Sequence, residues 1–319
     1  MENGIPVLAV VGPTASGKTK LGVELALALN GEVVSADSMQ IYQGMDIATA
    51  KPNEAEQKGI MHHLIGFLPP GERYSVARYV EDAGRVIREI HGRGKLPVLV
   101  GGTGLYISSL LDNIRFAEEE GNPSLRIRLR AFAEREGQAA LHARLSQIDP
   151  EYARTLHPNN LGRVIRAIEI FETTGKPMSA HLRESKAEPS PYRPVLLGLR
   201  FGDRQKLYDR INERVDRMVE AGLLDEARAA LPEAGSTAAQ AIGCKELLPF
   251  LEGKAPLEDC LEELKKATRR YAKRQLSWFQ RDERIHWLEC DRYDSFEALF
   301  DQALKTAAAA LAPSAAGRL

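Results

Sequence analysis

The 319-residue chain has few cysteines and no long apolar run. Its three cysteines, Cys244, Cys260 and Cys290, lie far apart and form no C-x-x-C pair, so neither a disulfide framework nor a zinc site is indicated. No stretch approaches the ~20 apolar residues of a membrane-spanning helix, and the N-terminus lacks the basic and apolar segments of a signal peptide. We therefore expect a cytoplasmic protein that does not associate with membranes.

A large net charge is also missing. The formal charge of −1 argues against a uniformly basic nucleic-acid binder, although it does not exclude a local basic surface. With 44% hydrophobic and 27% charged residues, the composition is that of an ordinary globular protein. A chain of 319 residues fits one large or two modest domains, and we expect two.

Short apolar runs alternate with helical stretches along most of the chain. The runs are residues 7–11, 33–34, 97–100, 195–199 and 285–288. They predict an α/β protein with a doubly wound parallel sheet flanked by helices, in which ligands gather at the carboxyl ends of the strands. Strand-like runs are missing between about residues 113 and 194, where we expect a helical insertion domain. The predicted organisation is a core of residues 1–112 and 195–306, the insertion 113–194, and a tail 307–319.

One motif near the N-terminus has the spacing of a phosphate-binding P-loop. It follows the first apolar run, precedes a helical stretch, and consists of Gly12, Pro13, Thr14, Ala15, Ser16, Gly17, Lys18 and Thr19. The glycines let backbone N–H groups and the helix N-terminus face phosphate oxygens. Lys18 adds a point charge, and the hydroxyl of Thr19 is placed to bind Mg²⁺. The motif predicts a P-loop NTPase-like core that holds a di- or triphosphate.

The sequence indicates the type of phosphate chemistry less directly than it indicates phosphate binding. The chain has no plain Asn-Lys-x-Asp guanine-binding motif, and the run 97–100 ends in glycines rather than in a Walker-B acid. Asp37, just beyond the second predicted strand, is the acid placed beside the P-loop at the edge of the sheet. A carboxylate there can act as a general base toward an incoming nucleophile. Asp37 could also cap a helix that begins at Ser38, and both roles are compatible.

Three arginines fall on one side of a predicted helix. Arg210, Arg214 and Arg217 lie at positions i, i+4 and i+7, beside an apolar stripe. One of them could reach a leaving phosphate. The alternative is a solvated helix face.

A basic and aromatic segment lies near the end of the chain. Residues 265–281 hold seven basic residues and no acid, with Tyr271, Trp278 and Phe279 among them. Basic side chains neutralise backbone phosphates, and aromatic rings stack on bases. This combination predicts RNA binding. Arginines of the insertion, Arg126, Arg163 and Arg166 among them, could extend the same surface.

Several blocks, in this order, resemble the tRNA dimethylallyltransferase family. They cover nearly the whole chain and comprise the P-loop, residues 37–42, 44–47, 49–52 and 101–106, His157-Pro158-Asn159 with Arg163 and Arg166, and residues 273–278. The resemblance implies a P-loop core with a helical insertion, Mg²⁺ as the cofactor, and dimethylallyl diphosphate and tRNA as substrates. It implies transfer of the dimethylallyl group to N6 of the adenosine at position 37, next to the anticodon. We expect a monomer.

The resemblance also implies roles for individual residues. Asp37 would accept a proton from the adenine amine as that amine attacks the allylic carbon. Thr19, Lys18 and the loop amides would hold the diphosphate, and Arg214 matches the family's diphosphate contact. The target base would leave its stack to reach the site.

The residues that match the family's tRNA-contacting blocks are spread over the chain. They are Asp37, Ser38, Met39, Gln40, Thr103, Arg126, Gly162, Arg163, Val164, Ile165, Arg166, Gln240, Ala241, Ile242, Gly243, Cys244, Lys245, Lys273, Arg274, Gln275, Leu276, Ser277, Trp278, Phe279 and Gln280. The chain departs from the family's pattern at Cys244, where a tyrosine is common.

Two other functions use the same motifs. A small-molecule or nucleotide kinase would use the P-loop with Asp37 as a base toward a hydroxyl. A nucleotide-gated RNA-binding protein would use the P-loop as a switch, without group transfer. The basic and aromatic segment favours an RNA substrate over the kinase, and the missing nucleotide-binding signatures weigh against the switch.

Overall fold

The computed structural model describes residues 4–114, 122–185, 188–235 and 237–312. The chain forms two compact units. The first, the core unit, comprises Met1–Leu111 and Pro191–Leu319, and the second, the insertion unit, comprises Asp112–Ser190. No helix among the described residues is long and apolar enough to cross a membrane.

The core unit is built on a six-stranded sheet in which every pair of neighbouring strands is parallel. The spatial order is β3-β2-β4-β1-β5-β6. The strands are β1 (Ile5–Val11), β2 (Gly31–Ser35), β3 (His62–His63), β4 (Leu96–Gly101), β5 (Tyr192–Arg200) and β6 (Ile285–Glu289). The predicted parallel α/β fold is confirmed. The short edge strand β3 was not predicted, because two residues show no periodicity.

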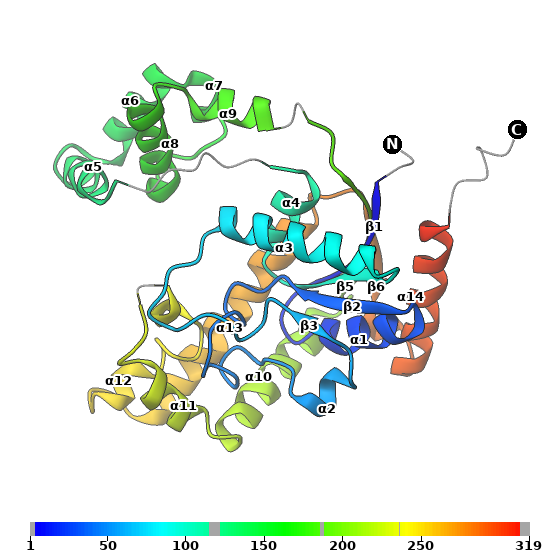
Figure 1. Ribbon diagram of the computed structural model, residues 1–319. Coiled ribbons are helices and arrows are strands. Elements are labelled where there is room, and N and C mark those ends of the chain that lie inside the picture. Colours follow the sequence, from blue (N-terminus) through cyan, green and yellow to red (C-terminus); the bar gives the residue numbers. More distant parts are fainter. Residues whose placement is uncertain (1–3, 115–121, 186–187, 236, 313–319) are drawn as a thin grey trace, which may run out of the picture. The chain divides into compact units, whose positions relative to one another are not determined.

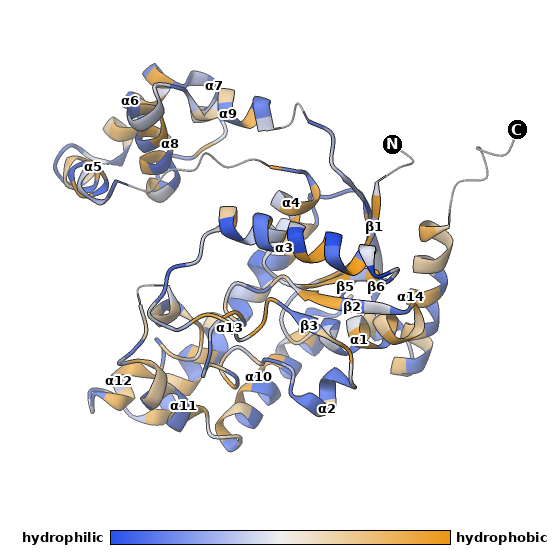
Figure 2. Cartoon of the chain, in the orientation of Figure 1, coloured by the Kyte–Doolittle hydropathy of each residue, from blue (hydrophilic) through white to orange (hydrophobic). Residues whose placement is uncertain are grey.

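Helices cover both faces of this sheet (Figure 1). The helices of the core unit that follow the N-terminal strands are α1 (Lys18–Ala28), α2 (Glu54–Gln57), α3 (Val76–Gly92) and α4 (Gly104–Leu111). Those that follow β5 are α10 (Arg204–Glu220), α11 (Leu223–Ala230), α12 (Leu248–Leu251), α13 (Leu257–Phe279) and α14 (Phe296–Leu311), with 3₁₀ turns at Ala238–Gln240 and Cys290–Arg292. Figure 2 shows β1 as a strongly hydrophobic element, in keeping with a strand covered on both faces.

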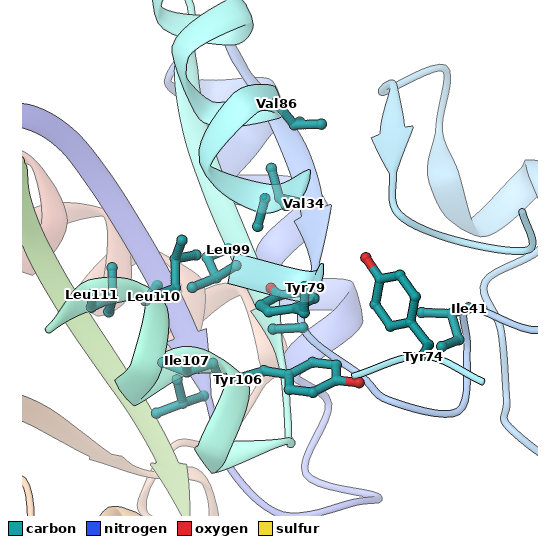
Figure 3. Packing of buried hydrophobic residues seen from close by; sticks show 14 of the residues in the cluster. Val34, Ile41, Tyr74, Tyr79, Val86, Leu99, Tyr106, Ile107, Leu110 and Leu111 are labelled. Carbon is teal, nitrogen blue, oxygen red and sulfur yellow. The ribbon is translucent and has the colours of Figure 1, made fainter. Parts of the chain in front are cut away.

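Helices α3 and α4 bury one face of the sheet. The hydroxyl of Ser75 caps α3 by accepting the N–H of Arg78 at 3.1 Å. Tyr79 of α3 stacks on Tyr106 of α4 with ring centroids 4.1 Å apart, and both pack toward the sheet (Figure 3). The Tyr79 hydroxyl donates to the carbonyl of Ser35 at 3.1 Å, so this buried ring ties α3 to the end of β2. The packing fixes the carboxyl edge of the sheet, where β2 meets the loop that carries Asp37.

Helices α1 and α14 bury the other face. Leu21 and Leu25 of α1 pack with Ala303 and Ala307 of α14 in one apolar cluster. The expected start of a tail at residue 307 is therefore wrong, because Ala307 is fully buried and α14 continues to Leu311. The alanine-rich sequence suggested an unpacked tail, but the small alanine side chains let α14 approach α1 closely. Residues 313–319 of that expected tail lie outside the described residues.

The insertion unit is helical throughout its described residues. Its helices are α5 (Pro123–Glu136), α6 (Gln138–Ile148), α7 (Pro150–Ala153), α8 (Leu161–Thr174) and α9 (Met178–Ser185). Leu129, Leu141, Leu145 and Ile168 belong to its own apolar core. At its two ends the side-chain amide of Asn113 lies 3.5 Å from the carbonyl oxygen of Pro189, so the chain enters and leaves the unit side by side.

The expected end of the insertion at residue 194 is too late, because β5 already begins at Tyr192. The Pro-rich residues 189–194 suggested a linker. Tyr192 to Pro194 nevertheless pair with β1, whereas the pairing of β5 with β6 begins only at Leu196. Pro194 thus lies where β5 has a single neighbour, and its missing N–H costs no ladder bond on the open side.

Candidate active site

The P-loop joins β1 to α1 in a wound conformation. Gly17, at the N-cap of α1, has φ of 90°, and no side chain caps the helix. The first N–H groups of α1 are therefore left for an anion, which the positive end of the helix dipole also favours. Ala15 has φ of 62°, an unusual value for a residue with a side chain, and its carbonyl accepts Nε of Arg210 at 2.9 Å. Arg210 thus holds the loop from behind.

A cavity of about 260 Å³ opens beside this loop, at the carboxyl ends of the strands. The P-loop contributes Thr14, Lys18 and Thr19 to its walls. The rest comes from residues 37–40, residues 48–50, α10, residues 240–243, Lys245 and α13. The structure thus brings together the P-loop, the Asp37 segment and parts of two distant helices that the sequence had indicated separately.

Two partly buried cations, Lys18 and Arg214, meet the carboxylate of Asp37 in this cavity, which Lys245 and Arg274 also line. Burial lowers the pKa of Lys18 to about 8; the negative charge of Asp37 opposes this shift, and the positive charge of Arg214 adds to it. Burial likewise lowers the pKa of Arg214, with Asp37 again opposing. Within the described residues, neither Lys18 nor Arg214 has a carboxylate within ion-pair distance. The cavity therefore carries an excess of positive charge, which suits an anion such as a diphosphate.

Asp37 lies in a turn rather than at the start of a helix. Its Oδ1 accepts the backbone N–H of Met39 at 3.0 Å, and residues 38–41 form turns. The helix-cap interpretation is therefore wrong. Thr103, in the loop after β4, fixes the same turn, since its hydroxyl accepts the N–H of Ser38 at 3.0 Å. The carboxylate of Asp37 is partly buried and lines the cavity.

The three arginines of α10 have different environments. Arg214 lines the cavity, whereas Arg210 is committed to the carbonyl of Ala15. Arg217 is exposed and donates to the carbonyl of Glu213 at 3.3 Å. Both readings of the spacing thus hold for different members: one arginine reaches the cavity and another lies on a solvated face.

A carboxylate that sequence reasoning missed anchors one wall of the cavity. Glu226 of α11 accepts the backbone N–H groups of three successive residues, Asp46, Ile47 and Ala48, each at 2.7 Å. Gln40 holds the continuation of the same loop by donating to the carbonyls of Thr49 and Ala50 at 3.3 and 3.1 Å. Residues 48–50 form part of the cavity wall. Glu226 does not line the cavity itself, but it fixes this wall through its hydrogen bond to the backbone of Ala48.

Comparisons of sequence and of structure relate this chain to the same group of known proteins. A family model described as IPP transferase matches residues 40–282, and one described as isopentenyl transferase matches residues 5–65. The tRNA dimethylallyltransferase of Acetivibrio thermocellus is 49% identical over 297 residues, which is 92% of this chain and 94% of that protein. The tRNA dimethylallyltransferase of Bacillus subtilis is 50% identical over 286 residues, with 89% and 90% covered.

The chain belongs to the IPP transferase, or tRNA dimethylallyltransferase, family. Solved structures agree. The full-length tRNA isopentenylpyrophosphate transferase of Bacillus halodurans superimposes with a TM-score of 0.72 at 44% identity, with 96% of each chain covered. A eukaryotic dimethylallyltransferase acting on tRNA gives a TM-score of 0.79 at 32% identity, covering 94% of this chain and 78% of that one. The family resemblance drawn from the sequence is confirmed.

In this IPP transferase chain, residues 265–279 of the basic and aromatic segment belong to α13, and the segment's residues divide between two faces. Lys273, Arg274, Ser277 and Gln280 are exposed, and Leu276 and Trp278 are partly buried. Phe279 is only 3% exposed and packs in the core, so the expectation that its ring stacks on a base is wrong. Its position four residues after the buried Gln275 explains this, because residues i and i+4 share a helix face.

Other members of the expected RNA-contacting blocks are also internal. Val164, Ile165 and Cys244 are at most 3% exposed, so their side chains have no free surface to offer RNA. Ala241 is 1% exposed and lines the cavity. The family pattern names contiguous blocks, whereas a helix such as α8 turns every third or fourth residue inward. Burial also raises the pKa of the Cys244 thiol to about 11. Gly162, Arg163, Gln240 and Lys245 remain exposed candidates.

In the insertion unit, Arg126 and Arg166 share one buried carboxylate. Arg126 forms a two-pronged contact with Glu169 at 2.8 and 2.9 Å, and Arg166 donates to Glu169 at 2.7 Å. Glu169 is 1% exposed, while the two arginine side chains remain 46% and 36% exposed. The arginines are thus held in fixed positions, and the pair keeps one net positive charge on the surface of the insertion.

Proposed function

We propose that this chain transfers a dimethylallyl group from dimethylallyl diphosphate to N6 of the adenosine at position 37, next to the anticodon, of tRNA, with release of diphosphate. The observation that carries the proposal is the convergence of Lys18, Arg214 and Asp37 in one cavity at the P-loop. The cations suit a diphosphate that leaves, and the carboxylate suits a proton that must be taken up. A tRNA substrate makes the cytoplasm the expected location, and a monomer stays a prediction.

The diphosphate would lie between the uncapped N-terminus of α1 and the two cations. Backbone N–H groups and the ammonium of Lys18 would contact it from the P-loop side, and the guanidinium of Arg214 from α10. Negative charge grows on the bridging oxygen as the carbon–oxygen bond breaks. Fixed positive groups stabilise that charge without reorganisation during the reaction, which is the largest electrostatic contribution we expect here.

The cavity also has an apolar side that fits the prenyl group. Ile211, Val215 and Met218 of α10 line it, together with Ile242 and Leu264. Burying the five-carbon group against them is favourable by about 0.8 kcal/mol for each CH₂-sized unit. A phosphoryl acceptor of a kinase would not need such a wall beside the phosphate. The apolar lining therefore favours the prenyl donor over the kinase alternative.

Asp37 would serve as the general base. The N6 amine attacks the first carbon of the dimethylallyl group, so a carbon–nitrogen bond forms. The bond from that carbon to the diphosphate oxygen breaks, and its electron pair leaves with the diphosphate. The proton released from N6 moves to the carboxylate of Asp37. The adenine must leave its stack to bring N6 to this carboxylate.

The residues fit a Mg²⁺ ion as cofactor. Mg²⁺ usually keeps several waters and binds through one or two protein oxygens together with substrate phosphates. The Thr19 hydroxyl lines the cavity beside Lys18, where it would hold the ion against a bound diphosphate. Among the described residues no group of three or more His, Cys, Asp or Glu forms a separate metal site. When bound, the ion neutralises charge on the departing diphosphate.

The test is incorporation of labelled dimethylallyl into bulk tRNA with Mg²⁺ and without ATP. Asp37→Asn keeps the shape of the side chain and removes the base, and we expect transfer to fall about 10²–10⁴-fold. Asp225→Asn, an exposed acid on α11, is the matched control and should leave transfer unchanged. Strict dependence on ATP with release of ADP would support the kinase instead.

A further inference from the structure

Gln275 of α13 joins two loops of the active site. Its side chain is 4% exposed, and both ends of its amide are used. Oε1 accepts the backbone N–H of Thr14 in the P-loop at 2.8 Å, and Nε2 donates to the carbonyl of Gly102 after β4 at 3.0 Å. Because one partner donates and the other accepts, the amide has a single satisfying orientation. Gln275 thus holds both loops from within the protein, and the RNA contact implied by its place in the family's block stays a prediction.

The loop after β4 is shaped to admit this helix. A Cβ atom at Gly102 would lie 2.1 Å from Nε2 of Gln275, and one at Gly104 would lie 2.3 Å from Cδ1 of Trp278. Contacts that short do not occur between real atoms, so α13 rests directly on the backbone of this loop. A displacement of α13 would therefore move residues 102–104, since nothing compressible lies between them.

The contacts continue from α13 to the general base. Tyr271 lies one turn before Gln275, and the hydroxyl of this partly buried residue interacts with both Thr103 and Gln275. Thr103 in turn accepts the N–H of Ser38, the residue after Asp37. One side of α13 thus reaches the diphosphate loop through Gln275 and the Asp37 turn through Tyr271. On the same turns of α13, Lys273, Arg274 and Ser277 are exposed.

We propose that Gln275 is a positioning residue that couples RNA binding on the exposed face of α13 to diphosphate binding at the P-loop. The proposal rests on the proposed function and adds to it a link between the two substrate sites. RNA held by the exposed basic residues fixes α13, and the Gln275 amide transmits that position to Thr14 and Gly102. Binding of tRNA and of diphosphate should then strengthen each other, and by thermodynamic linkage the factor is the same in both directions.

The first experiment needs no variant. The dissociation constant of inorganic diphosphate with Mg²⁺ is measured with and without unmodified tRNA on the full chain, and that of tRNA with and without diphosphate. We expect the two ratios to be equal and about fivefold or more. A ratio of one in the wild-type protein overturns the proposal. It leaves the proposed function intact if labelled dimethylallyl is still incorporated, so the two failures are distinguishable.

Two variants then locate the coupling. Gln275→Met keeps the length of the side chain but has neither a donor nor an acceptor. It should reduce both ratios of dissociation constants to one, while tRNA alone binds as in the wild type. Gln275→Glu keeps the acceptor for Thr14 but has no proton for the Gly102 carbonyl unless it is protonated. At pH 8 the transfer rate of Gln275→Glu should be at least tenfold lower than that of the wild type. The rate should approach the wild-type rate as the pH falls to 6.

Gln275→Met is the control for this recovery, since it cannot gain a donor at low pH. A merely structural role would lower thermal stability in both variants and would give no pH-dependent recovery specific to the glutamate. If both variants fold and keep the wild-type ratio, the coupling does not pass through Gln275 and the proposal is overturned.

Discussion

The carboxylate of Glu226 in α11 accepts the backbone N–H of Ile47 at 2.7 Å, although 179 residues separate the two in sequence. With the neighbouring N–H groups of Asp46 and Ala48, one charged side chain organises a whole turn of a loop. Hydrogen bonds to a charged group are stronger than those between neutral groups. The wall formed by residues 48–50 therefore depends on a helix that lies outside the cavity.

Glu226→Ala should loosen this wall. We expect the KM for dimethylallyl diphosphate to rise about tenfold and the free energy of unfolding to fall by about 2 kcal/mol, because three backbone donors lose a charged acceptor. The control is Asp225→Ala at the neighbouring position, where the side chain is 85% exposed and pairs with Arg228. Steady-state kinetics and urea unfolding check both values. Equal behaviour of the two variants would contradict the proposed role.

The charge of Lys18 should make diphosphate binding dependent on pH. Its pKa of about 8 in the free protein means that the ammonium is lost as the pH rises through 8. Inorganic diphosphate should then bind more weakly above pH 8, by at most about tenfold per pH unit, because binding must return the proton. Lys18→Arg stays charged in this range and is the control. The titration of diphosphate itself is common to both proteins, so parallel curves would refute the prediction.

Salt should weaken tRNA binding through exposed basic residues of α13. Lys273 is exposed, and within the described residues it has no acidic partner, whereas Lys266 pairs with Glu263 at 2.7 Å. Lys273→Gln should lower the slope of log affinity against log salt by about 0.7–0.9, the value for one lost phosphate contact. Lys266→Gln is the matched control on the same helix and should change the slope less. Filter binding at about 50 to 200 mM salt measures the slopes of the two variants and distinguishes them.

Glu32 should make the fold sensitive to acid. This residue of β2 is 4% exposed; burial alone would raise its pKa, but hydrogen bonds with His63, Arg93 and Lys95 lower it to about 2. A lowered carboxyl pKa gives stability that is present above the unfolded value of 4.5 and is lost as the pH falls toward 2.

Glu32→Gln should therefore reduce the free energy of unfolding at pH 7 by about 1–3 kcal/mol and flatten its fall between pH 4.5 and 2. Urea unfolding at several pH values checks this. Glu89→Gln, at an exposed acid that pairs with Arg85, should stay within about 0.5 kcal/mol of the wild type. An unchanged acid response in Glu32→Gln would assign the effect to other carboxylates.

The sequence predicted the sheet and the P-loop because their signals are local. Each strand except β3 is an apolar run, and the loop is one contiguous motif between a strand and a helix. Asp37 could be placed beside the P-loop because parallel strands end at a common edge. Its turn geometry could not, since the choice between a helix cap and an Asx turn depends on where Thr103 lies.

Glu226 and Gln275 were beyond such reasoning for a physical reason. Each acts on backbone atoms more than 170 residues away, and no spacing in the sequence records such a contact. The burial of Phe279 was within reach. Tyr271, Gln275 and Phe279 are spaced by four, so the period of a helix puts them on one face. Composition indicated a basic surface and could not say which rings point inward.

The insertion unit has one further consequence. Because Asn113 and Pro189 lie beside each other, the chain departs and returns at one place. A segment with adjacent ends can be exchanged or lengthened without disturbing the order of strands or the P-loop. The arginines fixed by Glu169 belong to that segment, whereas Lys18, Asp37 and Arg214 stay in the core unit. Substitutions on the arginine-bearing surface of the insertion and substitutions in the cavity at the P-loop can therefore be selected separately.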